Sequence, residues 1–396
     1  MSNLAHDESS APPESSRGGR REQDDHLTSD AEVEEVFKKL VKVTAKQGFS
    51  TWSPALKREL LESELNKVSM LTVKLKELKA SVAKDATKGE SDKKDQRSKK
   101  DLVGEKLGLW KELKNETFAQ CVSVVWGISL LNVFLSVQLM IVARMCALIS
   151  KPKDKRTGGA TAEAEEGGIK YNQARLLLEE EMERLITHFM QKNLREICSI
   201  ATEAAGKTLE PMGLKKKMTY QDVLSTLACI SSTTEFQISQ HGWCKTLMPK
   251  DTSTAEAKHL TQGGTDTEEV ESNQQKKNQE KEELLRQFHS NLKKVLGGQD
   301  FEFAVSMSAR CISDILMNKC QHLFVLQSGH KRDSRDHANQ ESVSPQMLPL
   351  AKVIPLVSTA SGETVSDCDG IIEYNVSKLP EVIRASADAF SVHVSV

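Results

Sequence analysis

The 396-residue sequence lacks the short motifs that usually carry catalysis or phosphate binding. It contains no glycine-rich nucleotide loop, no H-E-x-x-H or G-x-S-x-G motif and no EF-hand loop. The ten histidines are spread along the chain, and none lies four residues from another histidine or from a cysteine. Because no residue supports a reaction, we expect that the protein is not an enzyme, has no catalytic residues and needs no cofactor.

Metal, redox and nucleic-acid chemistry also have little support. The eight cysteines form no C-x-x-C pair, which excludes a zinc ribbon and a thioredoxin-like motif, and no metal site is expected. Most of them lie in apolar runs, as buried reduced thiols of a cytosol-facing protein do. The 54 basic and 56 acidic residues leave a formal net charge of −2, so a polybasic nucleic-acid-binding chain is excluded.

The first residues have almost nothing with which to build a core. Residues 1–31 contain no Val, Ile, Phe, Trp or Tyr, and no apolar stretch that could serve as a signal peptide or an N-terminal anchor. Such a segment cannot bury enough surface to offset the entropy of ordering it. We therefore expect a disordered polar tail over 1–32.

Four more stretches share this composition and separate the apolar segments. They cover residues 84–101, 151–168, 250–280 and 328–344, and we interpret them as flexible insertions rather than separate domains. The remainder, 33–396, is then one helical domain.

Apolar residues recur at helical spacing between these stretches. Ser53 and Pro54 are a plausible N-cap and first helical residue before a leucine stripe that runs from Leu56 to Leu78. Residues 170–205 carry a second stripe, which Gly206 is expected to end. The acidic run from Glu179 to Glu183 is expected to be a solvated helical face, and His188 a structural histidine.

Later helices are indicated by their end signals. Thr219 and Asp222 resemble a capping box, Gly297-Gly298 should end a helix, and Asp300 can cap the next one. A last helix is expected over about 379–390, and no alternating strand pattern is present. The sequence therefore predicts an all-α fold, a single elongated helical bundle with several disordered loops.

The stretch from Thr117 to Ala143 is the most unusual. Its 27 residues carry no charge, and about 20 apolar residues can span a bilayer. Seven polar or glycine residues dilute the run, however, and polar side chains are costly in lipid. We expect a long central helix buried in the bundle, with a membrane span as the alternative.

Two strings resemble the peroxin-3 family of peroxisome biogenesis factors. KLGLWKELKNETFAQCVSVVWGISLLNVFLSVQLMIVAR (106–144) is similar to the family segment that begins K-L-x-[IL]-W-x-[ED]-L-K and ends in a V-Q-[LV]-x-I string. LPLAKVIPLV (348–357) is similar to the family's P-L-A-K-[IL]-[IL]-P motif. Together with the helical segments in family order, the resemblance covers roughly residues 45–392.

The resemblance implies a docking receptor for peroxin-19, the soluble chaperone that carries newly made peroxisomal membrane proteins, which would be indirect clients. An amphipathic helix of peroxin-19 would bind around Trp110, with Lys106, Leu107 and Leu113 beside it. Lys106, Trp110 and Leu113 stand at i, i+4 and i+7, so they share one face of a helix. A core-packing role for Trp110 is the alternative from the residues alone.

The resemblance implies a place at the peroxisomal membrane, facing the cytosol. Members of the family begin with a basic stretch and a hydrophobic anchor, whereas this chain shows no anchor before Val36. The sequence given is therefore expected to be cytosolic if that anchor is truly missing. Two other functions stay open: a helical scaffold or tether for other peroxisomal factors, and a protein that spans the membrane with 117–143.

Overall fold

The structure is a computed structural model, and it describes residues 48–60, 66–87, 94–149, 171–249, 268–327 and 347–391. All of them belong to one unit, Val41–Val396. The expected tail over 1–32 and the expected insertions 151–168 and 328–344 lie outside the described residues. The described helices are the segment 48–60, α2 (Asn66–Thr87), α3 (Lys94–Ile149), α4 (Tyr171–His188), the π-helical turn η2 (Phe189–Asn193), α5 (Leu194–Leu209), α6 (Tyr220–His241), α7 (Trp243–Leu247), α8 (Glu268–Leu296), α9 (Gln299–Gln327), α10 (Leu350–Ser366), α11 (Cys368–Tyr374), the 3-10 turn η4 (Val376–Lys378) and α12 (Pro380–Ser391).

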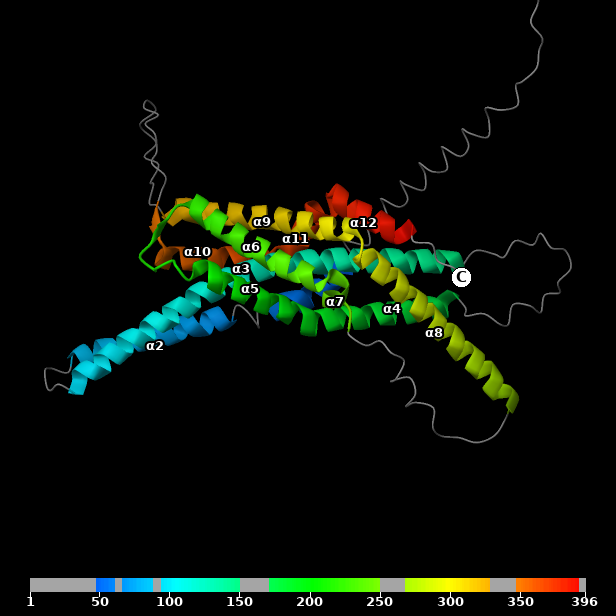
Figure 1. Cartoon of the computed structure of the whole chain (residues 1–396), viewed down its shortest axis with the longest axis horizontal. Coiled ribbons are helices and arrows are strands. Elements are labelled where there is room, and N and C mark those ends of the chain that lie inside the picture. Colours follow the sequence, from blue (N-terminus) through cyan, green and yellow to red (C-terminus); the bar gives the residue numbers. More distant parts are fainter. Residues whose placement is uncertain are drawn as a thin grey trace, which may run out of the picture. The chain divides into compact units, whose positions relative to one another are not determined.

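The 56-residue helix α3 organises the bundle (Figure 1). It contacts α2, α4, α5, α6, α8, α9, α10 and α12. Its most apolar 18-residue window has a mean hydropathy of 2.0, and 94% of that window is buried inside the protein. The all-α fold with a long buried central helix is therefore confirmed. Neighbouring helices provide the apolar surroundings that the composition of 117–143 requires.

Close contacts at two glycines show how the segment 48–60 packs along α3. A Cβ on Gly127 would lie 3.0 Å from Leu194 of α5 and 3.5 Å from Leu60. A Cβ on Gly48 would lie 2.8 Å from Leu139. Since residue 48 lies near 139 and residue 60 near 127, the segment runs antiparallel to α3.

The expected start of this helix was wrong. Ser53 and Pro54 lie inside the helix, which already includes residues 48–52. Phe49 is 1% exposed, so apolar packing extends the helix upstream of the sequence signal. Ser53 itself is buried rather than placed at a solvated helix end.

The segment 170–205 also ends differently from expectation. The π-turn η2 interrupts it, and α5 continues past Gly206 to Leu209. The nearest atom that a Cβ on Gly206 would meet is Nδ2 of Asn115 on α3, at 3.9 Å. This glycine therefore lies in a helix interior next to α3, and it does not terminate the helix.

Several end signals were predicted correctly. The Thr219 hydroxyl accepts from the backbone N–H of Asp222 (3.1 Å), and the Asp222 carboxylate accepts from the backbone N–H of Thr219 (2.7 Å), so the capping box is confirmed. α8 ends before Gly297-Gly298, and α12 occupies the range of the expected last helix. Asp300 lies in the first turn of α9 rather than at its cap.

Two expected insertions are partly helical. α2 continues to Thr87, α3 begins at Lys94 and α8 begins at Glu268, within the ranges 84–101 and 250–280. Lys, Glu and Gln, which are good helix formers, are frequent in the helical parts of these stretches, so polarity alone does not exclude a helix. The structure also contains a short antiparallel pair that the sequence did not indicate, β1 (Lys217–Met218) with β2 (Leu348–Pro349).

Candidate docking surface

The first part of α3 lies outside the densest packing of the bundle. It is joined mainly to α2, and the two helices form a hairpin that extends away from the other helices (Figure 1). Val68, Leu71 and Leu75 of α2 are buried at 6–7% exposure. Their i, i+3 and i+7 spacing places them on one face, and that face packs on α3.

The four residues expected to bind a partner lie on this part of α3, at different depths. Leu107 is 63% exposed, whereas Lys106 and Trp110 are half-buried. Leu113 is 4% exposed and belongs to the core. The structure thus brings Lys106, Leu107 and Trp110 to an accessible surface, and it places Leu113 beneath them.

The apolar surface extends beyond the expected residues. Val103 is 65% exposed and stands at i, i+4 and i+7 with Leu107 and Trp110. On α2, Met70 and Val73 are 58% and 48% exposed, but they lie on the face of α2 opposite the buried one and point away from α3. Val103 was not predicted from the sequence, although its spacing from Trp110 could have indicated it. We call Val103, Leu107 and Trp110 the α3 stripe.

A buried lysine fixes the base of the hairpin. Lys114 is 3% exposed, and its ammonium group donates to the backbone carbonyls of Leu209 (2.7 Å) and Met212 (2.9 Å). A cation suits this position because the carbonyls at the end of a helix carry partial negative charge. Burial, aided by the nearby charge of Lys111, lowers the pKa of Lys114.

The segment LPLAKVIPLV (348–357) is hydrogen-bonded to the adjacent loop, which joins α5 to α6. The backbone N–H of Leu350 donates to the carbonyl of Lys216 (2.9 Å), and that of Ala351 donates to the carbonyl of Leu214 (3.2 Å). β1 and β2 pair at the same place. The L-P-L-A-K segment therefore ties the start of α10 to a loop that Lys114 also binds.

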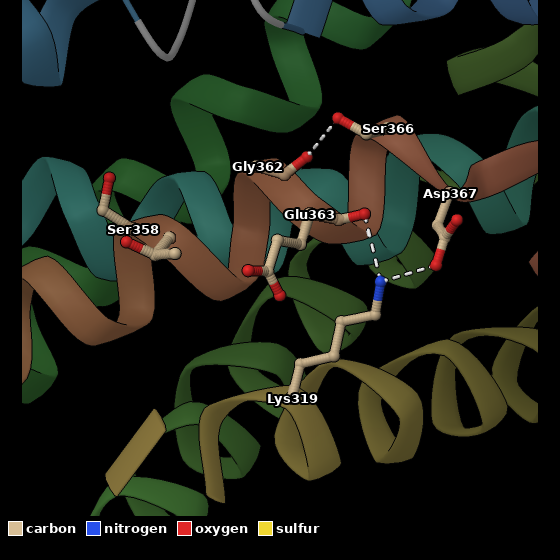
Figure 2. Close-up of a pocket in the computed structure, with 7 residues that line it drawn as sticks. Lys319, Ser358, Gly362, Glu363, Ser366 and Asp367 are labelled. Carbon is tan, nitrogen blue, oxygen red and sulfur yellow. Dashed lines mark hydrogen bonds and ion pairs between the residues drawn. The ribbon is translucent and has the colours of Figure 1, made fainter. Parts of the chain in front are cut away.

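Figure 2 shows a different feature, an open groove of about 700 Å³ between α9 and α10. Lys319 donates to the carbonyl of Glu363 (3.1 Å) and to the carboxylate of Asp367 (2.9 Å). The hydroxyls of Thr359 and Ser366 donate to carbonyls one turn earlier in α10. Lys319, Thr359 and Ser366 are thus engaged within the fold rather than directed at a ligand.

Among the described residues, the core offers neither a reactive thiol nor a metal-binding cluster. Burial raises the pKa of Cys121 and of Cys368 to about 12 and that of Cys320 to about 11, so these thiols stay protonated at neutral pH. No three His, Cys, Asp or Glu side chains in the described part of the chain come together in a way that could hold a metal ion.

One acidic residue differs from expectation. Glu181, within the run predicted to be solvated, is 8% exposed and accepts from His289 of α8 (2.6 Å) and from Arg184 (2.6 and 2.8 Å). Burial alone would raise its pKa, but the hydrogen bonds from Arg184 and His289 outweigh burial and lower it. The residue joins α4 to α8.

A family model described as Peroxin-3 matches residues 20–391, which is most of the chain. The matched range includes both family-like strings, the α3 stripe and the loop held by Lys114. A search of curated proteins gives no match.

Proposed function

The chain belongs to the peroxin-3 family, and from this membership we propose that it is the receptor on which peroxin-19 docks with newly made peroxisomal membrane proteins. The family assigns the protein to peroxisome biogenesis and to the peroxisomal membrane. It is not known as a family of enzymes. The docking role and the residues that serve it are the proposal.

The exposed α3 stripe is the observation that carries the proposal. A soluble protein gains little from exposing Val103 and Leu107 at 65% and 63% next to a tryptophan on one helical face. An amphipathic helix placed along this face would remove these side chains from water. The stripe is thus an apolar surface suited to receive an amphipathic helix.

Each expected residue has a distinct role in this proposal. Trp110 is the anchor, since a half-buried tryptophan can pack against a partner while its own position is fixed. Leu107 adds apolar contact area, and the Lys106 ammonium group can meet a carboxylate of the partner. Leu113, being buried, acts as a positioning residue that supports Trp110 from below.

Replacing Trp110 with alanine tests the proposal directly. A hot-spot aromatic contributes about 2 kcal/mol or more, which corresponds to roughly thirtyfold in affinity. We expect that loss for a labelled peptide covering the amphipathic helix of peroxin-19, measured by fluorescence anisotropy with the full chain. Phe236→Ala is the matched control, because Phe236 is 60% exposed on α6 and lies off the stripe.

Circular dichroism should show the same helical content for the wild-type chain and both variants. If Trp110→Ala binds as tightly as wild type, Trp110 is not part of the site. If the wild-type chain does not bind the peptide at all, the docking role itself is wrong.

A further inference from the structure

The exposed side of α6 is unusually poor in charge. Glu235 is the one formally charged residue of this 22-residue helix between Asp222 and His241, and its carboxylate accepts a hydrogen bond from a serine of α9. Solvent-facing helix positions usually carry Lys, Arg or Glu. From 225 to 236, the exposed residues of α6 are instead small or apolar: Ser225, Ala228, Cys229, Ser232 and Phe236. We call these five residues the α6 face.

Two phenylalanines are exposed at one end of the α6 face. Phe236 is 60% exposed, and Phe303 of the neighbouring helix α9 is 49% exposed. The hydrogen bond between Glu235 and Ser306 joins the two helices at this end, and Phe303 shares a face of α9 with Ser306, three residues later. Figure 1 shows α6 running beside α9, and the two helices are in contact. A soluble protein gains little from exposing two aromatic side chains at one place, so this end indicates a contact surface.

The sizes of the side chains on the α6 face indicate the kind of partner. Position 236 carries a large side chain, whereas 225, 228 and 232 carry small ones on the preceding turns. An ordinary amphipathic helix presents large apolar residues along its whole length. A second copy of α6 in the antiparallel direction is large where this face is small. If the two helices cross at Ser232, Phe236 of each copy lies over Ala228 of the other, and the two-fold symmetry makes this contact twice.

The charges at the two ends of α6 fit the same arrangement. Asp222 is exposed in the first turn of the helix, and His241 is exposed in its last turn. Antiparallel pairing brings the carboxylate of one copy to the imidazole of the other at both ends, whereas parallel pairing would bring like groups together. The lysines at 215–217 precede the helix and lie outside the α6 face. The middle of the contact buries no unpaired charge, because Glu235 is bonded to Ser306.

The exposed aromatic area is a substantial part of what a dimer needs. A phenylalanine side chain can bury roughly 200 Å², so Phe236 and Phe303 together leave about 200 Å² uncovered in each copy. A two-fold pair would cover about 400 Å², which is about a third of the roughly 1,200 Å² of the smaller stable interfaces. The remaining area can come from the other exposed side chains of two helices that are each about 33 Å long.

We propose that the α6 face is a homodimer interface, in which α6 of two copies pack antiparallel about a two-fold axis at Ser232. Phe236 of each copy packs over Ala228 of the other, and Phe303 borders the contact at each end. The α6 face shares no residue with the α3 stripe, so this inference does not rest on the proposed docking function.

Sedimentation equilibrium of the full chain over a range of concentrations tests the dimer. We expect the average mass to rise toward twice the 43.9 kDa of one chain. Phe236→Asp should raise the dissociation constant of the dimer at least about thirtyfold, because each dimer loses two buried aromatic contacts. Leu176→Asp is the matched control, since Leu176 is 65% exposed on α4 and receives the same charge off the α6 face. The control should associate like wild type, and circular dichroism should show equal helical content.

Cysteine cross-linking tests the register of the two helices. In a Cys229→Ser background, Ser232→Cys places the thiols of the two copies side by side at the axis, and copper phenanthroline in air should link them into a covalent dimer. Ser225→Cys is the matched control, because this exposed serine of the same face stands seven residues from the axis, about 20 Å from its counterpart. It should form no link, since a disulfide needs Cα atoms within about 7 Å.

A wild-type chain that stays monomeric at every concentration overturns the inference. A dimer that Phe236→Asp leaves intact also overturns it, because that dimer would use another surface. Equal cross-linking of the two cysteine variants would reflect random collision and would contradict the proposed axis. If Phe236→Asp weakens binding of the labelled peroxin-19 peptide to a monomeric chain, the α6 face contacts that partner instead, and the inference is wrong.

Discussion

Single charged side chains hold separate helices together in this bundle. Lys114 binds the end of α5 from α3, and Glu181 binds α8 from α4. Both are less than 10% exposed, so their hydrogen bonds are shielded from water. If one partner is removed, water cannot take its place, and the other partner is left without a hydrogen bond. Neither contact was expected from the sequence, because a lysine in a helix and an acidic run both usually face solvent.

Replacing Lys114 with methionine keeps much of the volume but removes the ammonium group. Because the carbonyls of Leu209 and Met212 each lose a charged donor, we expect the free energy of unfolding to fall by about 2 kcal/mol. Lys111→Met, at an exposed position one turn earlier in α3, should change it by less than about 0.5 kcal/mol. Urea unfolding followed by circular dichroism compares them, and equal midpoints would show that the buried lysine contributes nothing.

Glu181 makes stability depend on pH in a defined window. Its pKa is lowered in the folded protein, so the unfolded chain binds the proton more readily. The stabilising contribution is therefore fully present above the ordinary value of 4.5 and is lost as pH falls through the lowered pKa. We expect Glu181→Gln to cost about 2 kcal/mol at pH 7 and to flatten the fall in stability below pH 5, estimated from charged hydrogen bonds.

Urea midpoints between pH 3 and pH 7 measure this effect. Glu180→Gln is the control, since Glu180 is exposed next to Glu181 in α4. Wild type, Glu180→Gln and Glu181→Gln would show parallel pH curves if the hydrogen bonds from Arg184 and His289 had no energetic role.

At the scale of elements, the sequence predicted features that depend on residues close together in the chain. It missed features that depend on packing against other helices. The capping box at Thr219 was predictable because both of its partners lie within four residues. The π-turn after His188 packs on α4, α5 and α7, and Gly206 of α5 lies next to Asn115 of α3; no local sequence pattern records these neighbours. Trp110 and Leu107 were found from a family string, whereas the burial of Leu113 depends on how the other helices pack on α3 and could not be predicted.

The glycines of α3 should respond differently to alanine according to their surroundings. A Cβ on Gly108 meets nothing within 4 Å, whereas one on Gly127 would lie 3.0 Å from Leu194. In an exposed helix interior, alanine is more stable than glycine by about 0.5–1 kcal/mol. We expect Gly108→Ala to gain that amount and Gly127→Ala to gain nothing or lose stability. Thermal unfolding of the two variants measures the contrast, and an equal gain would mean that α5 does not approach α3 closely at Gly127.

At the scale of the whole molecule, one helix serves two purposes. The buried part of α3 provides the surface on which most other helices pack, and its first part carries the exposed α3 stripe. The same uncharged run that has the length of a membrane span is here the centre of a bundle. A substitution in α3 should therefore affect either folding or docking, according to its position.

The same change, valine to aspartate, separates these two purposes within the one helix. Val125 is 4% exposed, and an aspartate there would be a buried charge without a partner. Since such a change costs more than about 4 kcal/mol and domains are stable by only about 5–15 kcal/mol, we expect Val125→Asp to unfold or severely destabilise the chain. Val103 is 65% exposed, so Val103→Asp should leave the unfolding midpoint nearly unchanged. It should instead weaken binding of the peroxin-19 peptide, because it places a charge in the proposed apolar contact. Urea unfolding and peptide anisotropy on both full-length variants check this, and a stable Val125→Asp protein would contradict the burial of α3.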